Sequence, residues 1–181
     1  MPWKNGGGTT TEIAAFPEGA GLDTFGWRIS MARVEADGPF SAFPGIERTL
    51  SVIEGAGITL DFGGGRVEDL SIASEPLPFP GDAPVSAALS RGAITDLNVM
   101  TRRGVFSHRV EVIRGAAQSS LAAGREALLV LLSGGAARLN AASRSAALND
   151  RDCLRLEARE RAELALTPGA RLYLISFRPA S

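Results

Sequence analysis

Six polar residues in this chain have side chains suited to holding a small anion. A guanidinium group can grip a carboxylate through two parallel charge-assisted hydrogen bonds, which are shorter and stronger than neutral ones. Amide and hydroxyl groups add neutral hydrogen bonds, and an aspartate can orient the arginines or accept from a ligand. The six residues are Asn5, Arg28, Ser30, Arg48, Asp96 and Asn98. We predict that they form the ligand-binding site for a small-molecule carboxylate.

Two other interpretations of these residues stay open. Asp96 can pair with Arg28 or Arg48 merely to satisfy buried strand ends, and the pair is then structural. Alternatively, Asp96 is the general acid or base of an isomerase or hydrolase, and no other catalytic residue suggests itself. Proton transfer near neutral pH needs a carboxylate whose pKa is raised by burial, whereas contact with an arginine lowers that pKa. Contact between Asp96 and an arginine would therefore favour a binding protein, which we prefer over an enzyme.

The chain is poor in residues that bind transition metals or act as nucleophiles. Its single histidine, His108, alternates with the apolar Phe106 and Val110, which is typical of a partly buried strand residue. Imidazole groups suit first-row transition metals, but a site normally needs more than one of them. The lone Cys153 has no cysteine partner and no basic residue placed beside it by the sequence. We predict a protein without a bound transition metal and without a cofactor.

The elements that carry these residues belong to an internal duplication. Residues 48–62 predict a strand, a tight turn at 54–57 and a second strand, which we interpret as a hairpin. Residues 126–140 repeat this pattern of strand, turn and strand, and a shift of 79 residues places Gly55 on Gly134. The same shift places Leu50 on Leu129 and Trp27 on Phe106, so the match extends beyond one hairpin. Two similar β modules explain such a repeat better than a solenoid, which needs several short units.

The last strand of each module shows how the two copies differ. Asp96 to Met100 alternates cleanly between two faces and matches Tyr173 to Phe177 at a shift of 77. Asp96 is replaced by Tyr173, Asn98 by Ile175 and Met100 by Phe177. Polar residues of the first copy are thus replaced by bulky apolar ones, which indicates a pocket kept in the first module and filled in the second.

Residues 27–34 also alternate, with Arg28 and Ser30 on one face of the expected strand and apolar residues on the other. Either face can point inward. Four aromatic residues are candidates for the walls of a pocket, with ordinary core packing as the alternative. They are Trp3, Trp27, Phe40 and Phe43.

No segment has the sustained 3.6-residue periodicity of a helix, and short runs between glycine and proline turns predict an all-β chain. The prolines at 76, 78, 80 and 84 place their segment at the edge of a sheet or over an opening. Residues 85–89 suit either a strand or one helical turn. We predict two tandem small β-barrels or jelly-roll modules, one at 1–103 with the site and a degenerate copy at 104–181.

Composition excludes several classes of partner. The formal net charge of −1 and a pI near 5.9 give no basic excess for nucleic acid. No apolar run is long enough to cross a membrane, and a lone cysteine suits a reducing compartment, so we expect a cytoplasmic protein. Edge strands would make a homodimer possible.

The chain resembles the HutD/Ves family of double-cupin (bicupin) proteins. The matching stretches are 2–9 with Glu12 and Ile13, 27–30, 38–45 with Arg48, 79–82 and 96–100. The resemblance implies a cupin fold and a role in histidine utilisation, where members are thought to bind a pathway acid such as formylglutamate or urocanate. Other members are described as stress-induced. The resemblance implies no established reaction.

Overall fold

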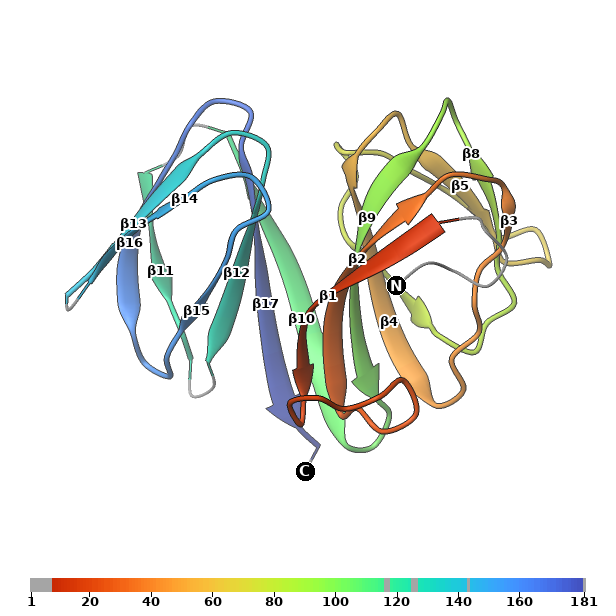
Figure 1. Cartoon of the computed structure of the whole chain (residues 1–181), viewed down its shortest axis with the longest axis horizontal. Coiled ribbons are helices and arrows are strands. Elements are labelled where there is room, and N and C mark those ends of the chain that lie inside the picture. The colour runs from red at the N-terminus through yellow and green to blue at the C-terminus, as the bar shows by residue number, and fades with distance from the viewer. Residues whose placement is uncertain (1–7, 116–117, 125–126, 143, 181) are drawn as a thin grey trace. The chain divides into compact units, whose positions relative to one another are not determined.

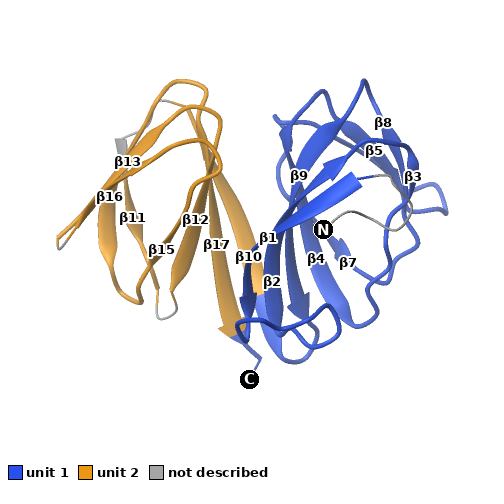
Figure 2. Ribbon diagram, in the orientation of Figure 1, with its two compact units in different colours: residues 1–107, 179–181 blue, residues 108–178 orange. Residues whose placement is uncertain are grey.

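The computed structural model describes residues 8–115, 118–124, 127–142 and 144–180 (Figure 1). All the elements of secondary structure in this part of the chain are β-strands, and every strand pairing that the structure describes is antiparallel. The chain divides into two compact units, residues 1–107 with 179–181 and residues 108–178 (Figure 2). The all-β prediction is therefore confirmed.

Two sheets form the first unit. The larger sheet has the strand order β1-β2-β9-β4-β7, and the smaller has the order β3-β8-β5-β6. The strands are β1 (Gly8–Phe16), β2 (Trp27–Val34), β3 (Gly38–Pro39), β4 (Ile46–Glu54), β5 (Ile58–Asp61), β6 (Val67–Leu70), β7 (Leu77–Pro80), β8 (Ser86–Leu89) and β9 (Ile94–Arg102). The proline-rich segment is the edge strand β7, as predicted, because proline cannot donate to a central ladder. Residues 86–89 form a strand and not a helical turn.

The second half of the chain repeats this arrangement. Its sheets have the orders β10-β17-β12-β15 and β11-β16-β13-β14. The strands are β10 (Phe106–Arg114), β11 (Gln118–Ala122), β12 (Leu128–Ser133), β13 (Ala137–Ala141), β14 (Ser145–Leu148), β15 (Cys153–Leu156), β16 (Arg161–Leu166) and β17 (Arg171–Pro179). Apart from β1, each strand of the first half has a counterpart at the same place in a sheet.

Strand register confirms the duplicated strand order but corrects the predicted alignment. Leu50 lies opposite Asn98 and belongs to the core of the first unit, whereas Leu129, 79 residues later, lies opposite Ile175 and is not in the core cluster of the second. The core residue of that strand is Val130, opposite Leu174. The β4–β9 pairing has a register irregularity after Val52, and the described β12–β17 pairing runs without one, which accounts for the difference. Leu174 therefore takes the interior place of Asn98, and Ile175 lies on the other face of β17.

The predicted hairpin at residues 48–62 is wrong, although both of its strands exist. β4 pairs with β7 and β9, whereas β5 pairs with β6 and β8, so the turn at Gly55 to Gly57 carries the chain from one sheet to the other. The same is true of β12 and β13. The physical reason is burial, because Leu50 and Leu60 pack face to face in one core cluster between two sheets.

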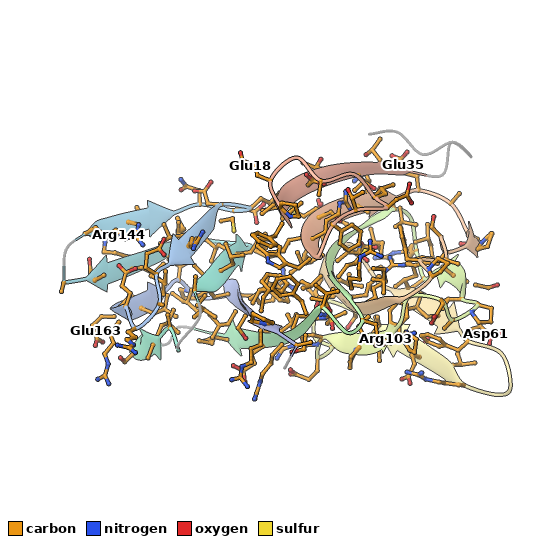
Figure 3. The ribbon with its side chains drawn as sticks, turned by 90° about the horizontal axis from the view of Figure 1, so that it is seen from below. Glu18, Glu35, Asp61, Arg103, Arg144 and Glu163 are labelled. Atoms are coloured by element: carbon orange, nitrogen blue, oxygen red, sulfur yellow. The ribbon has the colours of Figure 1, made fainter. Side chains whose placement is uncertain are left out.

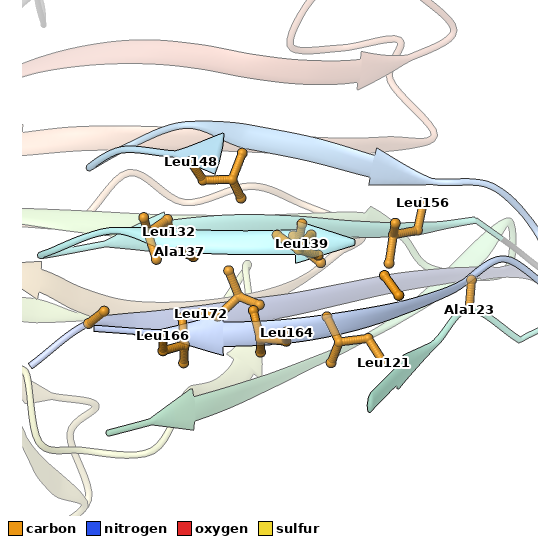
Figure 4. Packing of buried hydrophobic residues seen from close by; sticks show 13 residues of the cluster. Leu121, Ala123, Leu132, Ala137, Leu139, Leu148, Leu156, Leu164, Leu166 and Leu172 are labelled. Carbon is orange, nitrogen blue, oxygen red and sulfur yellow. The ribbon is translucent and has the colours of Figure 1, made fainter. Parts of the chain in front are cut away.

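Each unit has its own hydrophobic core. The core of the first unit includes Leu50, Val52, Ile58, Leu60 and Ile94, all at most 2% exposed. In the second unit, leucines and alanines from both sheets fill the equivalent space, as the labelled side chains in Figure 4 show. Burying one such leucine stabilises a fold by about 1.5–3 kcal/mol, so either cluster supplies a large share of the stability of its unit.

The crossing between sheets predicts a strong effect of Gly55→Ala. Gly55 has a φ of +100°, and an added Cβ would lie 2.8 Å from the Ala93 carbonyl oxygen. We expect a loss of about 2–4 kcal/mol in the free energy of unfolding, measured by chemical denaturation. The matched control is Gly63→Ala, at a φ of +74° with open space around it, which should cost about 1 kcal/mol. Equal losses in the two variants would show that the close approach at Gly55 is unimportant.

Candidate functional site

Five of the six predicted site residues point into the first unit from three neighbouring strands. β2, β9 and β4 are adjacent, and Ser30 and Leu50 both lie opposite Asn98. Opposed residues share a face of a sheet, and the face that carries Leu50 also lines the core. The five residues are Arg28, Ser30, Arg48, Asp96 and Asn98, and each is at most 6% exposed. The polar face of β2 is therefore the inward one, and the structure brings these five predicted residues together.

Arg48, Asn98 and Asp96 form a hydrogen-bonded chain. The Nε atom of Arg48 donates to Oδ1 of Asn98 at 2.7 Å, and Nδ2 of Asn98 donates to Oδ1 of Asp96. Asp96 thus reaches Arg48 through an amide. Among the described residues, no carboxylate lies within ion-pair distance of the Arg48 guanidinium. The structural ion pair between Asp96 and an arginine is therefore not formed.

Asp96 is a buried carboxyl group with one oxygen unused. It is 1% exposed, and its Oδ2 atom has no hydrogen-bond partner in the part of the chain that the structure describes. Burial raises the pKa of Asp96 to about 7, because a charged carboxylate is poorly solvated there. The charge of Arg48, the nearby Ala32 backbone N–H and the Asn98 amide lower the pKa, but they offset only part of this effect. Near neutral pH, Asp96 is populated both with and without its proton.

Aromatic rings cover the guanidinium of Arg48. Its central carbon lies 4.8 Å from the ring centroid of Phe40, 5.4 Å from that of Phe79 and 5.8 Å from that of Phe43. A cation gains electrostatic stabilisation over the face of such a ring. Burial nevertheless lowers the pKa of Arg48 to about 10, with the charge of Asp96 opposing that shift, so the group stays positive at neutral pH.

Backbone hydrogen bonds and surface ion pairs hold the loop that carries Phe40 and Phe43 in place. Phe43 N donates to the Gly81 carbonyl, and Gly81 N donates to the Ile46 carbonyl, both at 2.7 Å. A Cβ at Gly81 would lie 3.0 Å from the Ile46 carbonyl oxygen and 3.1 Å from that of Phe43, so a larger residue would fit only if this backbone shifted by a few tenths of an ångström. The exposed Arg103, labelled in Figure 3, adds ion pairs to Asp82 and Glu47. These contacts hold two of the aromatic rings over Arg48.

Arg28 is engaged differently from Arg48. Its Nε atom donates to Oε2 of Glu12 at 2.7 Å, and its Nη1 atom donates to Oγ of Ser30 at 3.0 Å. Glu12 comes from β1, where it lies opposite Ser30, and its side chain is 43% exposed. The positive charge of Arg28 is therefore already balanced by a carboxylate, and that of Arg48 is the more available to a ligand.

The structure also corrects and extends the predicted walls. Trp27 lies on the face of β2 opposite to Arg28, where its ring stacks on Phe16 at a centroid distance of 6.0 Å. Phe40 and Phe43 do line the site, whereas Asn5 and Trp3 lie outside the described residues. Sequence reasoning missed Glu12 and Phe79 as site residues. Both stand in the stretches that carry the family resemblance, which was the available signal.

The equivalent region of the second unit is apolar. Leu172 and Leu174 occupy the interior places of Asp96 and Asn98, because they lie opposite the core residues Leu132 and Val130. The predicted replacements Tyr173, Ile175 and Phe177 are buried, but they lie on the other face of β17. Burial also raises the pKa of the Cys153 thiol to about 11, which leaves the thiol protonated and unreactive near neutral pH.

Two further features of the described residues bear on function. No group of three or more histidine, cysteine, aspartate or glutamate residues is placed to hold a metal ion within that part of the chain. It also contains no helix with the length and apolar character needed to cross a membrane.

Comparison with curated proteins gives relatives along most of the chain. An uncharacterised 21.2 kDa protein in the hutC 3′ region of Pseudomonas putida is 36% identical over 161 residues, which is 88% of this chain and 83% of that protein. Protein Ves of Citrobacter koseri is 40% identical over 111 residues, covering 61% of this chain and 56% of Ves.

Solved structures agree with this kinship and identify the fold. HutD from Pseudomonas fluorescens SBW25, in a formate condition, has 32% identity and a TM-score of 0.79, covering 100% of this chain and 94% of that one. A cupin 2 conserved barrel domain protein from Leptotrichia buccalis has 10% identity and a TM-score of 0.58, covering 94% of this chain and 89% of that one, which is a likeness of fold alone. The double-cupin fold is thus confirmed. Since the HutD family model matches residues 1–174, the chain belongs to the HutD family.

Proposed function

We propose that this protein binds a small carboxylate metabolite in the interior of its first cupin unit and thereby regulates histidine utilisation. The observation that carries the proposal is Arg48, a buried guanidinium with no described carboxylate within ion-pair distance. A buried charge without a partner is costly, so an anionic ligand would complete the site.

Kinship supports the pathway and the ligand class. One relative is named for the hutC 3′ region of Pseudomonas putida, and a structural relative is a HutD in a formate condition. Formylglutamate and urocanate are therefore the first acids to test. The second unit would then act as a scaffold, because its equivalent interior positions are filled by Leu172 and Leu174.

A second function has an observation in its favour. Asp96 does not contact an arginine directly, and burial raises its pKa to about 7. A carboxyl group whose pKa is raised by burial and that does not contact an arginine is suited to proton transfer and not to a simple ion pair. The alternative is therefore an isomerase or hydrolase without a metal, in which Oδ2 of Asp96 exchanges a proton with the substrate.

The binding proposal predicts that Arg48→Ala weakens affinity for the carboxylate by about 30-fold or more, because one partner of a buried charged contact is lost. Arg28→Ala should weaken it less, since Glu12 already balances that guanidinium. Thermal shift with formylglutamate, urocanate, histidine, glutamate and formate identifies the ligand, and calorimetry gives its affinity. A ligand at 100 times its Kd should add about 2.7 kcal/mol of stability.

The matched control for Arg48→Ala is Arg33→Ala, which removes an exposed arginine of the same sheet paired with the exposed Glu35. This control should bind as tightly as the parent protein. If Arg48→Ala also binds like the parent, the interior of the first unit is not the anion site.

The enzyme alternative predicts turnover that depends on Asp96. Asp96→Asn keeps the shape of the side chain but removes its proton-transfer capacity, so the rate should fall by about 100-fold or more while affinity changes little. NMR of formylglutamate and of urocanate incubated with the protein measures this directly. If both compounds are unchanged after prolonged incubation with the parent protein, the enzyme alternative is wrong and the binding function remains.

A further inference from the structure

The hydrogen-bonded chain from Arg48 to Asp96 fixes where the proton of Asp96 must sit. Arginine can only donate, so the Asn98 atom that receives from Arg48 is Oδ1, and Nδ2 must face Asp96. Nδ2 also can only donate, so Oδ1 of Asp96 must accept. When Asp96 is neutral, its proton therefore lies on Oδ2, the oxygen without a partner among the described residues.

The groups around Asp96 leave one charge unbalanced. From β4 comes Arg48, and from β2 and β1 come Arg28 and Glu12, which neutralise each other. The smaller sheet contributes apolar core residues such as Ile58, Leu60 and Ala87. Of these groups, Arg48 stays positive and Asp96 is the one whose charge can change when an anion arrives.

We propose that Asp96 takes up a proton from solvent on Oδ2 when a carboxylate binds at Arg48, and that the resulting O–H donates a hydrogen bond to the ligand. This inference rests on the proposed binding function. The physical reason is that Arg48 can neutralise one negative charge in this interior, whereas a bound carboxylate and an ionised Asp96 would bring two. Protonating Asp96 removes the excess charge and at the same time gives Oδ2 its missing partner.

The protonated carboxyl group sets the chemical class of the ligand. An acid with a carboxylate for Arg48 and an oxygen acceptor for Oδ2, such as an amide or formyl carbonyl, satisfies both groups. A ligand that offers only a donor at that point would face the O–H and lose affinity. Asp96 is therefore a specificity-determining residue for acids that carry a second oxygen acceptor.

Proton uptake makes binding depend on pH in a defined direction. With its pKa near 7, Asp96 of the free protein is mostly protonated at pH 6 and about nine-tenths ionised at pH 8. Binding should therefore take up close to no proton at pH 6 and up to about 0.9 proton at pH 8. Above pH 7, the Kd should rise by up to about tenfold per pH unit.

Isothermal titration calorimetry with N-formyl-L-glutamate and with urocanate tests this inference. Titrations at pH 6 in phosphate and in Bis-Tris, and at pH 8 in phosphate and in Tris, give the number of protons taken up from the difference in observed enthalpy between buffers. The expected result is an uptake that grows with pH in the parent protein and is absent in Asp96→Asn. Asp69→Asn, an exposed aspartate bonded to Thr59, is the matched control and should behave like the parent.

The outcomes separate this inference from the proposed function. Binding without proton uptake at pH 8 overturns the role of Asp96 and leaves carboxylate binding intact. If neither acid binds to the parent protein, the proposed function falls and the inference falls with it. The proton count on the parent protein decides the matter even if Asp96→Asn does not fold.

Protein stability gives a second readout without ligand. Because the pKa of folded Asp96 lies above its ordinary value of 3.8, the folded state holds more protons than the unfolded state between about pH 4 and pH 7. The free energy of unfolding contributed by this group therefore falls as pH rises through that window. Asp96→Asn should lack this fall, and identical pH profiles for the two proteins would show that Asp96 does not titrate there.

Discussion

The first unit is organised around one buried positive charge. Arg48 cannot lose its proton at neutral pH, so its guanidinium must be satisfied where it lies, between two sheets and away from water. The fold supplies an amide oxygen from the neighbouring strand and three aromatic rings. The loop that carries two of those rings is in turn tied to the turn at Gly81. Much of the surrounding structure serves to hold this cation without neutralising it.

Duplication explains how such a site can exist in a stable domain. Apart from β1, the two units have the same strand order, and the second fills the relevant interior positions with Leu172 and Leu174. That packing yields the usual gain from buried apolar surface, about 25 cal/mol per Å². The first unit gives up this gain at the equivalent positions and carries buried polar groups there. The polar set of the first unit is therefore not the set that packing alone would favour at these positions.

The two buried arginines of the first unit differ in how a carboxylate reaches them. Glu12 contacts Arg28 directly from β1, which has no counterpart among the described strands of the second unit. Asp96 is kept from Arg48 by the Asn98 amide, so burial dominates its pKa. The same residue types thus produce a neutral ion pair at one place and an available cation beside a titrating acid at another.

The sequence alone determined the class of the fold and the duplication, and it placed Arg28 with Ser30 and Asp96 with Asn98 on shared strand faces, because strand alternation and glycine turns are local signals. Arg28, Ser30, Arg48, Asp96 and Asn98 were all identifiable as candidates, but only the tertiary structure decided that the polar face of β2 points inward. Only the tertiary structure decided that β4 and β5 belong to different sheets, since turn residues do not specify whether two apolar strands pair edge to edge or pack face to face. It also decided that Asn98 stands between Arg48 and Asp96, because reach and register across neighbouring strands set which side chains touch. That arrangement of three side chains governs the charge of Asp96, and no local pattern in the chain encodes it.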